Sequence, residues 1–244
     1  MGTETMPAGN LMVVGAHAGD AENMAGATVL KHTRAGRQAI IVHMTLGEAG
    51  HPTLAPEVYA EQREKEIQSA AVLLGARTVC LGYADGLLPA DDQVKLRLCD
   101  LIREERPAAI ITHWRGSLHK DHTATYEIVR DAIFYAALPA IRRALPAHRV
   151  PGLYFAENWE DMEGWRADLF LDVSSVWEDY LAALRTHELM RGGVSPFRYL
   201  EYYDALGTTR GCLGGFPKAV AFMLPPSGWV RKLQYLPGLE PATG

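Results

Sequence analysis

The chain has 244 residues, of which 48% are hydrophobic and 22% are charged, a composition typical of a globular protein. Its formal net charge of −5 indicates no basic surface for nucleic acid, and no apolar run approaches the roughly 20 residues that span a bilayer. The three cysteines are widely spaced, so neither a disulfide framework nor a cysteine-rich zinc site is indicated. The first residues lack the basic and apolar stretches of a signal peptide, and we therefore expect a cytoplasmic protein without membrane insertion.

The first half of the chain alternates between short apolar runs and longer stretches with helical spacing. The predicted elements, in chain order, are a strand at 11–16, a helix at 21–35, a strand at 38–45, a helix at 57–75, a strand at 78–83, a helix at 92–105, a strand at 108–113 and a helix at 122–138. This alternation predicts an α/β fold, in which helices cover both faces of a mostly parallel sheet.

The second half is less regular. We predict short strands at 152–157, 168–173 and 218–224, and a helix at 174–191 that ends at Gly192 and Gly193. The aromatic stretch at 197–207 is interpreted as core packing, with a cover over the pocket or a subunit contact as alternatives. Because no repeat or linker is visible, we predict one domain over 1–244, with extended tails at 1–9 and 226–244.

Two polar clusters follow predicted strands. His17 and Asp20 come directly after the first strand, and His119 and His122 lie in the segment after the fourth. Ligands bind at the carboxyl ends of the strands in such sheets, so the two clusters are expected to meet there. His17 and Asp20, together with one histidine of the second cluster, form a set of two imidazoles and one carboxylate, which suits a catalytic Zn²⁺ with a position left open for water.

Residues 13–51, VVGAHAGDAENMAGATVLKHTRAGRQAIIVHMTLGEAGH, resemble the start of the LmbE-like or PIG-L family of zinc-dependent deacetylases. The first family motif is AHPDDE, a later loop reads TxGE, and a further motif is HxDH, matched here by His119 to His122. The resemblance extends over about residues 10–135. It implies the Rossmann-like fold, one divalent metal held by His17, Asp20 and His122, a role for His119 at the oxyanion or leaving group, and a role for Asp121 in orienting His119.

The chain departs from the family at Gly19. The first Asp of HPDD acts as general base in the deacetylases, whereas Gly19 has no side chain. Loss of a positioned base commonly costs about 10²–10⁴ in rate. We predict Glu48, after the second strand, as the replacement, with Glu22 and His119 as alternatives.

Three further residues are predicted to contact the substrate. They are Arg63 in the EQREKE segment, Asp85 in YADGLLP and Arg115 in HWRGSLH. A helix-surface arginine and a turn aspartate are the ordinary alternatives for the first two. His113 and His43 are expected to be structural, and His187 is left open.

Three functions are compatible with these residues. The first is a zinc-dependent hydrolase that removes an acyl group from an amide of a small, sugar-like substrate. The second is a zinc-dependent hydratase that adds water to an unsaturated carboxylic acid, similar to oxalomesaconate hydratase. The third is a metal-binding relative without catalysis. A small-molecule substrate is expected, and a homo-oligomer is left open.

Overall fold

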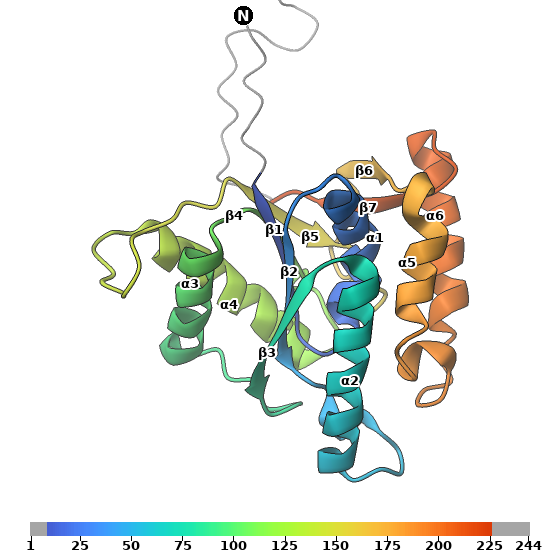
Figure 1. Cartoon of the computed structure of the whole chain (residues 1–244), viewed down its shortest axis with the longest axis horizontal. Helices are drawn as coiled ribbons and strands as arrows, with labels where there is room; N and C mark the ends of the chain where they lie inside the picture. Colours follow the sequence, from blue (N-terminus) through green and yellow to red (C-terminus); the bar gives the residue numbers. More distant parts are fainter. Residues whose placement is uncertain (1–8, 226–244) are drawn as a thin grey trace, which may run out of the picture.

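A seven-stranded sheet forms the centre of the computed structural model, which describes residues 9–225 (Figure 1). The strands are β1 (Asn10–Gly15), β2 (Ala39–Thr45), β3 (Arg77–Tyr83), β4 (Pro107–Thr112), β5 (Gly152–Ala156), β6 (Leu169–Asp172) and β7 (Ala219–Met223). The helices are α1 (Asp20–Arg34), α2 (Pro56–Leu74), α3 (Asp92–Glu105), α4 (Lys120–Ala137), α5 (Trp177–Leu184) and α6 (Tyr199–Gly214), with 3-10 turns η1 (Glu48–Gly50), η2 (Ser174–Val176) and η3 (Leu189–Arg191).

The strand order β3-β2-β1-β4-β5-β7-β6 confirms the predicted α/β fold. Strands β1 to β5 run parallel to one another, whereas β7 runs antiparallel to both β5 and β6. The chain moves outward from β1 through β2 to β3, and then crosses back to place β4 on the other side of β1. The carboxyl ends of β1 and β4 therefore flank a topological switch point, which is where open α/β sheets bind ligands.

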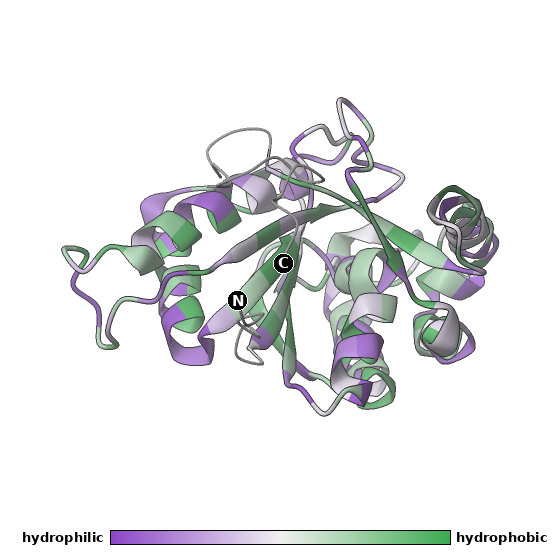
Figure 2. Ribbon diagram, turned by 90° about the horizontal axis from the view of Figure 1, so that it is seen from above, coloured by the Kyte–Doolittle hydropathy of each residue, from purple (hydrophilic) through white to green (hydrophobic). Residues whose placement is uncertain are grey.

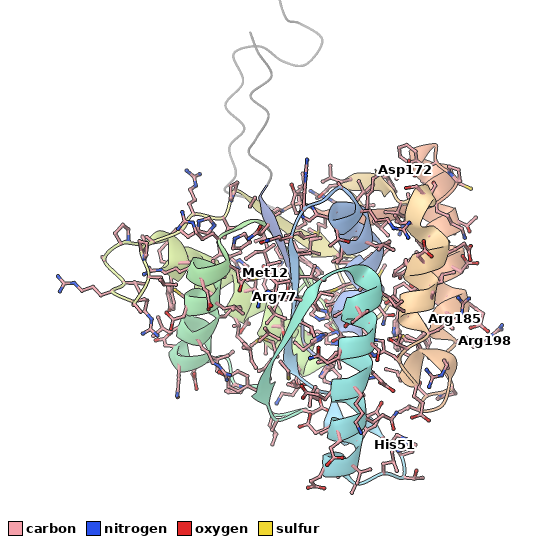
Figure 3. All side chains as sticks on the ribbon, viewed as in Figure 1. Met12, His51, Arg77, Asp172, Arg185 and Arg198 are labelled. Carbon is pink, nitrogen blue, oxygen red and sulfur yellow. The ribbon has the colours of Figure 1, made fainter. Side chains whose placement is uncertain are left out.

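Helices cover both faces of the sheet because the inner strands are buried on both sides. In β1, Met12 and Val14 pack with α3 and α4, while Leu11 and Val13 pack with α1 and α5, as the two-residue period of a strand requires. Figure 2 shows the strands coloured as hydrophobic between helices of mixed hydropathy. In Figure 3, Met12 lies within the sheet layer, whereas Arg198 lies at the outer edge near α5.

The predicted elements of the first half agree closely with the structure, and α3 has the predicted bounds. The single helix predicted at 174–191 is wrong. The structure divides this segment into η2, α5 and η3, and His187 turns into the interior between α5 and η3, where it is fully buried. Helix α6 was not predicted, although it contains most of the aromatic stretch at 197–207.

The glycines of α6 explain why the sequence pattern did not predict a helix in this segment. A Cβ atom at Gly207 would lie 2.2 Å from the Trp177 ring, and one at Gly211 would lie 2.6 Å from the carbonyl oxygen of Phe216. Glycine lowers helix propensity by about 1 kcal/mol relative to alanine, but here it allows α6 to approach its neighbours closely.

The predicted tails at 1–9 and 226–244 lie outside the described residues, apart from Gly9. Within residues 9–225, no helix combines the length and the apolar character that a membrane crossing requires.

Candidate metal centre

The five parallel strands end at one edge of the sheet, and each is followed there by polar residues. These are His17 and Asp20 after β1, Glu48 after β2, Asp85 after β3, His119, Asp121 and His122 after β4, and Glu160 and Asp161 after β5. The edge of the sheet that was expected to bind ligands therefore brings together residues as far apart in the sequence as His17 and Asp161.

Asp20 lies between the two predicted imidazole ligands. Its Oδ2 atom is 3.0 Å from Nδ1 of His17 and 3.2 Å from Nε2 of His122. Ring nitrogens of His17, His119 and His122 also lie within 4.8 Å of one another. The structure thus brings the three predicted metal ligands together, with His119 beside them.

The turn that carries His17 and Asp20 is held by hydrogen bonds to its backbone. The N–H of His17 donates to Asp20 Oδ2 at 2.8 Å, and the N–H of Gly19 donates to Glu22 Oε2 at 3.1 Å. Gly19 has φ +94°, a left-handed conformation that favours glycine. This backbone requirement explains why a residue without a side chain suits the position.

Arg63 is buried against the same turn and forms hydrogen bonds to its backbone. Its side chain is 2% exposed, and its guanidinium donates to the carbonyl oxygens of Ala18 and Leu46 and to Glu66. We predicted a substrate contact for this residue, but these hydrogen bonds instead connect the turn after β1 with the loop after β2.

Glu22 is also buried beneath the turn. Besides Gly19, its carboxylate faces His43, with 3.4 Å between Oε1 and Nε2. Burial raises the pKa of Glu22, but the charge of His43 and a hydrogen bond from it outweigh that effect and lower the pKa to about 2. These contacts place Glu22 on the inner side of the turn, so it is poorly placed as a replacement base.

A carboxylate lies behind each of the two imidazoles. Nδ1 of His122 hydrogen-bonds to Asp161 Oδ1 at 2.9 Å, and Nε2 of His17 lies 3.1 Å from Asp85 Oδ1 and 3.5 Å from Asp121 Oδ2. Metal-binding histidines commonly have such an outer carboxylate, which orients the ring and raises its basicity. Asp85 therefore lies behind His17, whereas we had predicted it as a substrate contact.

His113 is close to the ligands but has no free nitrogen for a metal. Its Nδ1 hydrogen-bonds to Asp161 Oδ2 at 2.7 Å, and its Nε2 accepts the backbone N–H of Ala16 at 3.0 Å. Both ring nitrogens are therefore used, as expected for a structural histidine. Asp161, which the sequence analysis did not single out, binds both His113 and His122 from the segment after β5.

The donor set fits a divalent metal. Because Nδ1 of His122 faces Asp161, a neutral His122 ring would point the Nε2 lone pair at Asp20. Burial lowers the pKa of His122, but the charges of Asp20 and Asp161 outweigh it and raise the pKa to about 10. The carboxylates of Asp20 and Asp161, which stabilise an extra proton on His122, would stabilise a bound cation in its place.

His119 is positioned to donate a hydrogen bond from Nε2 rather than to accept a proton. Its Nδ1 accepts the backbone N–H of Asp121 at 3.2 Å, which caps the start of α4. The neutral ring then carries its hydrogen on Nε2. Burial and the nearby charges of His17 and His122 lower the pKa of His119, which favours this neutral form.

Three other residues with predicted roles have the following contacts in the structure. The Asp121 carboxylate accepts the N–H of Gly86 at 2.7 Å and faces His17, so its hydrogen bonds do not show it orienting His119. The Glu48 carboxylate accepts the N–H of Asp85 at 2.9 Å, which places it behind the residues that contact His17. Arg115 is exposed and lies over the Trp114 ring, with 5.1 Å to the ring centroid.

Glu160 is a second residue that the sequence analysis missed. Its Oε2 lies 3.5 Å from Nε2 of His122, and its side chain is 23% exposed. Burial raises the pKa of Glu160, and the charges of Asp20 and Asp161 raise it further against the opposing effect of His122. A motif search could not have found this residue or Asp161, because the match to family motifs ends before β5.

The segment that carries Glu160 and Asp161 is docked on the segment after β4. The N–H of Leu118 donates to the carbonyl oxygen of Glu160 at 2.9 Å, and the N–H of Glu163 donates to that of Gly116 at 3.0 Å. A Cβ atom at Gly116 would lie 1.9 Å from the carbonyl oxygen of Glu163. Only glycine allows this close approach.

We therefore expect Gly116→Ala to lower the free energy of unfolding by about 1–3 kcal/mol, because the added methyl group separates the two segments. Gly50→Ala is the matched control, since no atom lies within 4 Å of a Cβ there, and it should change stability by less than about 0.5 kcal/mol. Denaturant unfolding measures both. Equal stability of the two variants would contradict the close approach.

Solved structures share this architecture. The 4-carboxy-2-hydroxymuconate hydratase of Pseudomonas putida superposes with a TM-score of 0.83 at 22% identity, covering 92% of this chain and 99% of that one. The N,N'-diacetylchitobiose deacetylase of Pyrococcus horikoshii superposes with a TM-score of 0.79 at 22% identity, covering 90% and 85%. At these identities the likeness concerns the fold.

Sequence relatives include enzymes of both kinds. The 4-oxalmesaconate hydratase of Pseudomonas putida is 26% identical over 214 residues, which cover 84% of this chain and 81% of that enzyme. The diacetylchitobiose deacetylase of Thermococcus kodakarensis is 28% identical over 180 residues, which cover 67% of this chain but only 63% of that enzyme's length. The family model of GlcNAc-PI de-N-acetylase, PIG-L, matches residues 12–133, which are half of the chain and extend from within β1 to within α4. The chain belongs to the PIG-L family.

Proposed function

We propose that this protein is a zinc-dependent hydrolase that cleaves the N-acyl amide bond of a small, polar, sugar-like molecule. The observation that carries the proposal is the arrangement around Asp20, where two imidazoles meet one carboxylate and each imidazole has a further carboxylate behind it. A set of three protein ligands leaves a position open for water, as catalytic zinc sites do. Deacetylases among the relatives support the reaction type.

His17, Asp20 and His122 would hold the ion. A bound zinc ion would lower the pKa of its water and polarise the amide carbonyl. In the overall reaction the water oxygen bonds to the carbonyl carbon, the C–N bond breaks, and a proton passes from water to the amine nitrogen. His119, with its hydrogen on Nε2, is placed to donate to the carbonyl oxygen or to the leaving nitrogen.

The charge of the site favours a substrate without several carboxylates. Asp20 is one of the ligands, and Asp85, Asp121, Glu160 and Asp161 lie around them. The combined negative charge of these five carboxylates exceeds the positive charge of a divalent ion. Arg63, the buried cation nearby, is bonded to backbone carbonyls and to Glu66. A neutral amide meets less repulsion here than a polycarboxylate does.

A hydratase is the second candidate, because the 4-oxalmesaconate hydratase matches more of the chain than the deacetylase does. The absence of a side chain at Gly19 also departs from the deacetylase motif. Exposed Arg115, on the segment between β4 and α4, is the group that would favour a carboxylate substrate.

Substrate tests distinguish the two reactions. Zinc-loaded protein should release acetate and a free amine from N-acetylglucosamine or N,N'-diacetylchitobiose, and removal of the metal with a chelator should abolish the release. Loss of absorbance from 4-carboxy-2-hydroxymuconate without acetate release would favour the hydratase. One bound zinc ion per chain with neither activity would favour the non-catalytic relative. A cytoplasmic location stays a prediction from the sequence, and a homo-oligomer stays open.

A further inference from the structure

The chain needs a proton acceptor because Gly19 has no side chain, and most carboxylates around the ligands already have hydrogen-bond partners. Asp161 binds His113 and His122, and Asp121 accepts the N–H of Gly86. Asp85 accepts the N–H of Ala49 and lies against His17. His119 is excluded as the acceptor because its Nδ1 lone pair already accepts a backbone N–H.

Glu160 differs from these groups. Among the described residues, none donates a hydrogen bond to its carboxylate, and its side chain is partly open to solvent. Its Oε2 nevertheless lies 3.5 Å from Nε2 of His122, the nitrogen that also faces Asp20. The carboxylate is therefore both close to the ligand atoms and accessible to a small molecule.

The backbone of Glu160 is fixed on both sides. Its N–H donates to Asn158 Oδ1 at 3.2 Å, and its carbonyl oxygen accepts the N–H of Leu118 at 2.9 Å. The side chain thus projects from an anchored turn, and a proton-transfer group needs such fixed placement.

We infer that Glu160 is the catalytic proton-transfer residue of this chain and performs the role for which Gly19 lacks a side chain. This inference rests on the proposed function. The carboxylate takes a proton from water as the water oxygen bonds to the amide carbonyl carbon. It then delivers that proton to the amine nitrogen as the C–N bond breaks, while His119 donates a hydrogen bond from Nε2.

Glu160→Gln tests the role, because it keeps the shape of the side chain and removes its ability to accept a proton. On the N-acetyl substrate that the wild type cleaves, kcat should fall by about 10²–10⁴, with KM changed by less than about threefold. Zinc content, measured by elemental analysis, should stay at one ion per chain. Glu163→Gln is the matched control, since it removes the same charge from an exposed position in the same segment and should leave kcat unchanged.

Two further measurements separate catalysis from structure. Formate should restore part of the activity of Glu160→Ala, which a purely structural role does not predict. Acetohydroxamate, a probe that needs no substrate turnover, should bind zinc-loaded Glu160→Gln about 10–100-fold more weakly than the wild type, because a hydrogen bond to a charged group is lost.

The outcomes distinguish this inference from the proposed function. If the wild type releases no acetate, the proposed function fails, and acetohydroxamate binding still decides whether Glu160 acts at the site. If the wild type is active but Glu160→Gln keeps kcat within tenfold, the inference is wrong. Loss of zinc from Glu160→Gln would also overturn it, since Glu160 would then be a metal ligand.

Discussion

Asp20→Asn is expected to remove bound zinc and activity together. Asp20 Oδ2 contacts both His17 and His122, and asparagine keeps the shape of the side chain while removing its charge. Since replacing even an outer partner of a ligand costs about 10–100-fold in affinity, loss of this carboxylate should weaken zinc binding by more than about 100-fold. A catalytic metal contributes several kcal/mol to transition-state stabilisation, so kcat/KM should fall by roughly 10³-fold or more.

Thermal unfolding gives a second measurement for Asp20→Asn. Zinc at 100 times its Kd should stabilise the wild type by about 2.7 kcal/mol and leave the variant almost unchanged. Asp100 lies on α3 and forms an exposed ion pair with Arg143. The control variant Asp100→Asn should therefore be stabilised by zinc as much as the wild type is. Zinc-dependent stabilisation of Asp20→Asn equal to that of the wild type would show that the metal lies elsewhere.

Local patterns predicted the first half of the fold because each element there carries its own signal. Buried parallel strands appear as continuous apolar runs, and Gly75 ends α2 in a left-handed conformation. The second half lacks such signals. Helix α6 contains glycines at positions of close packing, and α5 ends at Leu184, shortly before the buried His187.

Only part of the candidate metal centre could likewise be predicted from the sequence. His17, Asp20 and a histidine after β4 could be predicted because each follows a strand whose carboxyl end lies at the switch point. The resemblance to the HxDH motif then selected His122. Asp161 and Glu160 could not, since their place depends on β5 pairing with β4, a tertiary contact without a local motif. The direction of the Asp121 carboxylate also depends on a distant group, the N–H of Gly86.

Asp161→Asn is expected to weaken both the fold and the metal site, because one buried carboxylate binds two imidazoles. Its oxygens accept from His113 at 2.7 Å and from His122 at 2.9 Å. Asparagine can accept from one ring but presents an N–H₂ group to the other. The free energy of unfolding of the metal-free protein should fall by about 2–4 kcal/mol at neutral pH, and zinc affinity should fall by about 10–100-fold.

The pH dependence of this loss follows from the direction of the pKa shift. Burial raises the pKa of Asp161, but the charge of His113 and hydrogen bonds from His113 and His122 outweigh it, so the folded-state pKa lies well below 3.8. A carboxylate with a depressed pKa stabilises the fold above its unfolded-state pKa, and the contribution disappears as the pH falls toward the folded value. The difference in stability between the wild type and Asp161→Asn should therefore be constant from pH 7 to about 5 and shrink below about pH 4.

His113→Asn distinguishes the effect of Asp161 on the stability of the fold from its effect on zinc binding. His113 uses both ring nitrogens in hydrogen bonds to Asp161 and to the Ala16 N–H, so its replacement should lower the free energy of unfolding while zinc stoichiometry stays at one ion per chain. Denaturant unfolding of the metal-free proteins and zinc titration calorimetry provide the two readouts. Asp161 binds His113, which we assign as structural, and His122, which we assign as a metal ligand. A loss of zinc in His113→Asn as large as that in Asp20→Asn would mean instead that His113 is a metal ligand and His17 a structural residue.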